Sequence, residues 1–168
     1  TRGRQFDGPR EVPVEVATHA AGTVEFVSGP VVTVITSWEM FTSSLPYIEI
    51  YGSEGVLSTP DPNVFKGEPV LRRGIREDLG YTAPRGSWVE VPMAYSGDVG
   101  RAVGIAEMVD AMQNGRPARA GLELAYHVLE VMLAFDASSE SGSHVEIDST
   151  CERPAALPVN PVGDTVRF

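Results

Sequence analysis

The sequence has little lysine and cysteine and no long apolar run. Lys66 is the one lysine, and Cys151 is the one cysteine. A single cysteine can neither close an intrachain disulfide nor build a thiolate zinc site, so nothing points to an oxidising compartment and we expect a cytoplasmic protein. No stretch reaches the roughly twenty apolar residues of a membrane-spanning helix, and residues 1–30 lack the pattern of a secretory signal. We therefore predict no membrane association.

Positive charge is scarce as well. The 168 residues include 13 basic and 23 acidic side chains, for a formal net charge of −10. Proteins that bind nucleic acid or an anionic membrane surface need clustered lysine and arginine, so we expect neither partner. With 42% hydrophobic residues, the chain is long enough for one ordinary globular domain with its own core.

Alternating apolar and polar residues predict strands in the first half of the chain. From residue 11 to about residue 50, apolar residues recur at every second position, which is the period of a strand with one buried face. Residues 31–38 are rich in β-branched side chains and are interpreted as a central, buried strand. Phe26 and Ile35 are placed on the packed side of the central strands. The predicted strands are residues 11–16, 22–27, 31–38, 46–51, 56–58, 69–73, 88–91 and 144–147.

Two later segments have the three- and four-residue spacing of amphipathic helices. The first covers residues 100–113 and is stopped by Asn114 and Gly115. The second covers residues 122–139, and Gly142 is expected to end it in the left-handed conformation that glycine adopts at little cost. Each helix has a single apolar stripe, so each is expected to pack through one face.

Strands followed by helices are typical of an α+β domain. We predict a mostly antiparallel, open-faced sheet with the two main C-terminal helices packed on one face. The other face is expected to meet another domain or subunit. The chain divides into an N-terminal extension (1–10), the α+β domain (11–150) and an extended or disordered tail (151–168).

The local motifs of several enzyme classes are missing. The sequence has no G-x-S-x-G, H-E-x-x-H or G-K-[ST] motif, and no G-x-G-x-x-G follows a predicted strand. The histidines His19, His127 and His144 are interpreted as packing or surface residues rather than metal ligands or bases. Glu123 and Glu130 are interpreted as part of a solvated helix face. We predict no metal site and no catalytic residue in this chain.

Several segments carry a resemblance to a known family. They are THAAGTVEF (18–26), SG (28–29), YIEIYGSEGVL (47–57), GIAEM (104–108), GRP (115–117) and LAYHVLEV (124–131). In order and spacing they resemble the C-terminal domain of the Gfo/Idh/MocA family of NAD(P)-dependent oxidoreductases. The resemblance extends from about residue 11 to residue 158.

The resemblance implies a two-domain parent enzyme. An N-terminal Rossmann domain would hold NAD or NADP, and this domain would present an open sheet to the substrate and to a neighbouring subunit. The family's cofactor glycines and its Glu-Lys-Pro motif belong to the other domain, and Lys66 does not match that lysine. We expect no cofactor in this chain alone, and we expect the Rossmann domain and another copy of this chain as partners. The start at Thr1 favours a piece of a longer protein.

Position within the family also suggests which side chains touch the substrate. Strand ends and the loop after the third strand commonly do so, which assigns substrate binding to Thr18, His19, Ser37 and Glu39. The alternative for His19 is a hydrogen bond to a neighbouring strand or loop. For Ser37 and Glu39 the alternative is a polar strand end.

The implied function is that of the substrate-binding and oligomerisation domain of an NAD(P)-dependent oxidoreductase. The expected substrate is a sugar, a cyclitol or a related small polyol, and the domain is not expected to be catalytically competent alone. The alternative is a free-standing, non-catalytic dimeric binding or assembly module derived from the family. A third possibility, an independent enzyme that uses His19 and nearby carboxylates, requires a deep pocket.

Overall fold

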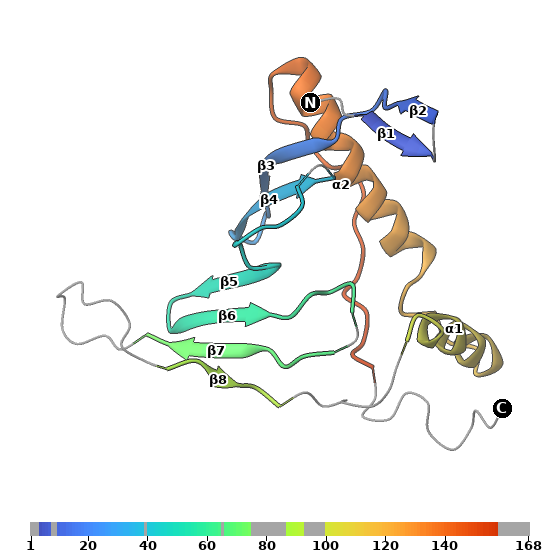
Figure 1. Cartoon of the computed structure of the whole chain (residues 1–168). Coiled ribbons are helices and arrows are strands. Elements are labelled where there is room, and N and C mark those ends of the chain that lie inside the picture. Colours follow the sequence, from blue (N-terminus) through green and yellow to red (C-terminus); the bar gives the residue numbers. More distant parts are fainter. Residues whose placement is uncertain are drawn as a thin grey trace. The chain divides into compact units, whose positions relative to one another are not determined.

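The computed structural model describes residues 4–7, 10–38, 40–64, 66–74, 87–92 and 100–157 (Figure 1). The chain forms two compact units. The first consists of residues 1–43 and 122–152, and the second of residues 44–121 and 153–168.

The first unit contains two hairpins and the longer helix. Strand β1 (Arg4–Asp7) pairs antiparallel with β2 (Arg10–Pro13), and β3 (His19–Glu25) pairs antiparallel with β4 (Val31–Ser37). Helix α2 (Leu122–Ser141) lies against β3. The two hairpins form separate sheets in the described residues.

One face of the β3–β4 hairpin is turned toward α2. A Cβ atom built on Gly22 would lie 2.9 Å from Cε1 of Phe135 in the helix, so the face of Gly22 is the covered one. Partial burial alternates along β3 in agreement with this, since Gly22 and Val24 are half-buried whereas Ala21 is exposed. Directly paired residues share a face of the sheet, so Ile35, which pairs with Ala21, lies on the uncovered face.

The second unit contains a four-stranded antiparallel sheet and the shorter helix. The strands β5 (Ile48–Gly52), β6 (Gly55–Thr59), β7 (Val70–Arg73) and β8 (Val89–Glu90) lie side by side in sequence order. Helix α1 is Val103–Gln113. Among the described residues of this unit, no strand comes within 8 Å of α1 between Cα atoms.

Glycines end several elements as the sequence predicts. Gly115 follows α1 with a φ of 62° and Gly142 follows α2 with a φ of 64°, both in the left-handed region. Gly52 pairs with Gly55 across the β5–β6 turn. A Cβ atom on Gly55 would lie 2.5 Å from the carbonyl oxygen of Arg72, so β7 can approach β6 closely only because that side chain is missing.

The α+β class is confirmed, because antiparallel sheets and two helices make up the described chain. The strands form three sheets rather than one. Residues 144–147 pair with no strand in the described chain, so the strand predicted there is wrong, and residues 4–7 form a strand that was not predicted.

The prediction of a buried central strand at residues 31–38 is also wrong. In the described residues β4 is paired on one edge only, with β3. Phe26 and Ile35, which were placed on the packed side, are each 50% exposed. The β-branched residues correctly predicted a strand, but no described residue of the unit covers the apolar side chains of β4 completely.

Candidate functional site

Three of the four residues assigned to substrate binding meet at the end of the β3–β4 hairpin that lies away from its turn. His19 begins β3 and lies directly opposite Ser37, which ends β4. The ladder continues by one hydrogen bond, in which the backbone N–H of Trp38 donates to the carbonyl of Thr18 at 2.8 Å. Glu39 lies outside the described residues. His19 and Ser37 are therefore neighbours in space although they belong to different strands.

The three side chains differ in accessibility. His19 and Ser37 pair directly and therefore share the uncovered face of the hairpin, whereas alternation places Thr18 on the face toward α2. In agreement, Thr18 is 7% exposed, Ser37 is half-buried and His19 is exposed. Of the three, Thr18 is therefore the packed residue, whereas His19 and Ser37 remain at least partly accessible to solvent.

The chemistry of this pair suits a hydroxyl-rich ligand. An imidazole and a hydroxyl can each donate and accept hydrogen bonds, as the hydroxyl groups of a polyol do. A metal centre is not apparent, because no group of three His, Cys, Asp or Glu side chains is arranged to hold an ion in the described residues.

The described residues do not fit a nicotinamide dinucleotide. Such a cofactor rests its pyrophosphate on a glycine-rich turn between a strand and the N-terminus of a helix. Gly100 and Gly104 flank the start of α1, yet they are not part of a G-x-G-x-x-G sequence.

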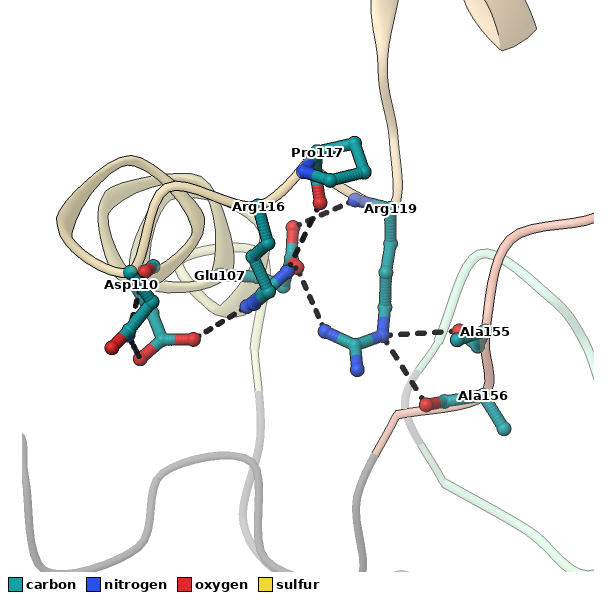
Figure 2. A network of polar contacts seen from close by, with 8 residues as sticks. Glu107, Asp110, Arg116, Pro117, Arg119, Ala155 and Ala156 are labelled. Carbon is teal, nitrogen blue, oxygen red and sulfur yellow. Dashed lines mark hydrogen bonds and ion pairs between the residues drawn. The ribbon is translucent and has the colours of Figure 1, made fainter.

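A second polar cluster lies where α1 ends (Figure 2). The carboxylate of Glu107 accepts hydrogen bonds from Nη1 of Arg116 at 2.5 Å and from Nη1 of Arg119 at 2.8 Å. It also accepts the backbone N–H of Arg119 at 3.1 Å. Arg116 extends to Asp110 as well, and Nε of Arg119 donates to the carbonyls of Ala155 and Ala156 at 3.0 and 3.2 Å.

The electrostatics of this cluster are those of a structural network. The side chain of Glu107 is 10% exposed, and its hydrogen bond with Arg116 lowers its pKa in spite of the burial. Asp110 and Glu107 in turn raise the pKa of Arg116. Both guanidinium groups are engaged by acceptors of the chain itself, so the cluster holds the turn at residues 115–117 and leaves its arginines little capacity for a ligand.

The sequence of the chain matches one known protein family over most of its length. The model for the C-terminal alpha/beta domain of the Gfo/Idh/MocA oxidoreductase family matches residues 4–147. The chain belongs to this family. A search among curated proteins and a search among solved structures each found no match.

Gfo/Idh/MocA enzymes are two-domain oxidoreductases that generally use NAD(P), with an N-terminal Rossmann domain. In the present Gfo/Idh/MocA domain the match begins at β1 and includes the His19–Ser37 pair, α1 and α2. In the part of the chain that the structure describes, no helix has the length and hydrophobicity needed to cross a bilayer.

Proposed function

We propose that this domain binds the substrate for an NAD(P)-dependent oxidoreductase and that the substrate is a sugar, a cyclitol or a related small polyol. The observation that supports the proposal is the His19–Ser37 pair on the uncovered face of β3–β4, within the matched residues. Hydride transfer requires the nicotinamide and the substrate to be held in contact. The pair supplies one wall of such a site, so the Rossmann domain of the parent chain supplies the other, and this domain alone is not catalytically competent.

We further propose that the domain assembles with a second copy through the four-stranded sheet, in the cytoplasm. The two faces of that sheet differ in character. Ladder pairing places Ile50, Leu57, Leu71 and Val89 in one row, with Ile48 on the same face. The side chains of Ile48, Ile50 and Val89 are 44%, 55% and 62% exposed. An apolar face left open to this extent favours a partner surface.

Ligand binding tests the first proposal. The intact protein that carries this domain is titrated with a panel of sugars and cyclitols, and the dissociation constant or KM is measured. We expect His19→Ala and Ser37→Ala each to weaken binding of the best ligand about tenfold, which corresponds to roughly 1.4 kcal/mol. His144→Ala, at another exposed histidine of the first unit, serves as the control and is expected to leave binding unchanged.

Two other outcomes would contradict the proposal. Equal effects of His19→Ala and His144→Ala would show that the pair at the hairpin end is not the binding site. A protein that forms dimers and binds no polyol would instead support the free-standing assembly module.

A further inference from the structure

After α2 the chain reverses at Gly142 and returns along the same helix, as can be followed in Figure 1. The reversal is held by Ser138, whose hydroxyl donates to the carbonyl of Ser143 at 2.8 Å. Farther back in the helix, Glu130 accepts the backbone N–H of Asp148 at 2.9 Å and that of Ser149 at 3.0 Å. The returning segment, residues 143–149, is thus attached to α2 at both of its ends.

The second attachment point includes a histidine. Nδ1 of His127 lies 2.8 Å from the hydroxyl oxygen of Ser149, one helical turn from Glu130. Hydrogen bonding by Ser149 and by the backbone of Asp148 lowers the pKa of Glu130, so the carboxylate is charged at neutral pH. Hydrogen bonds to an ionised acceptor are stronger than those between neutral groups.

The segment held in this way has the sequence of a strand. His144, Val145, Glu146 and Ile147 alternate in polarity, and the pattern predicts a strand. In the described residues the segment joins no sheet. The two N–H groups that follow it are bound to the carboxylate of Glu130, which the sequence had suggested was merely solvated.

We propose that Glu130, assisted by His127, is a latch that holds residues 143–149 on α2 and keeps this strand-forming segment out of sheet pairing. Opening the latch frees two backbone donors, the N–H groups of Asp148 and Ser149. An extended segment with unpaired backbone groups can add to the exposed edge of a sheet.

Hydrogen exchange of the whole chain at neutral pH tests the latch. In Glu130→Ala we expect the amides of Asp148 and Ser149 to exchange at least tenfold faster than in the unmodified chain, while the amides of α2 keep their rates. Glu123→Ala, at an exposed acidic residue of the same helix, is the matched control and is expected to leave both amides unchanged.

Unchanged exchange at Asp148 and Ser149 in Glu130→Ala would overturn the proposal. If Glu130→Ala also raised the exchange rates of the α2 amides, the loss of the helix itself could explain the result. The milder Glu130→Gln then tests the latch, because its side-chain amide keeps one acceptor oxygen and disturbs the helix less. With α2 intact, Glu130→Gln must then give exchange rates at the two amides that lie clearly above those of Glu123→Ala. Rates equal to the control would refute the latch.

Discussion

At the residue scale, Gly22 sets how closely α2 can approach β3. Its missing side chain leaves the space that the ring of Phe135 occupies. The same face carries Thr18, which is buried. A glycine in the interior of a strand is unfavourable in itself, and here the close approach of the helix accounts for it.

We predict that Gly22→Ala destabilises the fold by about 1–3 kcal/mol, the usual cost of an added group in a packed contact. Denaturant unfolding measures the change. Gly104→Ala in α1 is the control, because a Cβ atom there meets nothing within 4 Å, and we expect no loss of stability. Equal free energies of unfolding for the two variants would show that Phe135 can move aside at no cost.

At the scale of elements, the end of α1 depends on the polar network of Glu107, Arg116 and Arg119. Gly115 reverses the chain in a left-handed conformation, and the arginines that follow return to the carboxylate of Glu107. The sequence motif GRP is thereby explained as a helix-ending turn that is closed by ion pairs. Arg119 connects the same turn to the chain at residues 155–156.

We predict that Glu107→Gln destabilises this turn by about 1–3 kcal/mol, because a poorly exposed charge-assisted acceptor is lost. The folded-state pKa of Glu107 is lowered from its ordinary value of 4.5, so its contribution is present above about pH 4.5 and is lost as the pH falls through the folded pKa. Unfolding measured from pH 7 to pH 2 should therefore show a weaker acid dependence in Glu107→Gln. An unaltered pH profile would contradict this assignment.

At the scale of the whole molecule, large apolar side chains remain exposed on both units. Among the described residues, Ala111 and Thr18 are the ones classed as buried. A chain with 42% hydrophobic residues that buries so few of them has apolar surface that further protein can cover. The family to which the chain belongs has an N-terminal Rossmann domain, and we propose that a second copy covers the apolar face of the four-stranded sheet.

The adjacent residues Ile50 and Tyr51 test the second copy, since they lie on opposite faces of β5. We predict that Ile50→Glu weakens self-association at least tenfold, because a charge is placed on the apolar face where it would have to be buried against the second copy. Tyr51→Glu introduces the same charge on the other face and should leave association unchanged. Sedimentation equilibrium measures both, and the reverse ranking would assign the interface to the face of Tyr51.

Much of the secondary structure could be predicted from the sequence, because it depends on residues that are close together along the chain. The β-branched residues of 31–38 and the helical spacing in residues 122–139 predicted β4 and α2, and Gly115 and Gly142 predicted where the helices end. The resemblance also placed His19 and Ser37 at strand ends, and the ladder brings them together. These features follow from the backbone preferences of individual residues and from the spacing of apolar residues. Both can be recognised in a short stretch of sequence.

Tertiary structure alone decided which partner each group meets. Residues 144–147 have the pattern of a strand, yet the backbone that follows them is bound by Glu130, which precedes it by 18 residues. Phe26 and Ile35 have the character of core residues and are half-exposed, and Thr18 is the buried member of the predicted site. The spacing of apolar residues and the composition of a segment determine which secondary structure it can form. Its burial and its hydrogen-bond partners depend on segments that are distant in sequence.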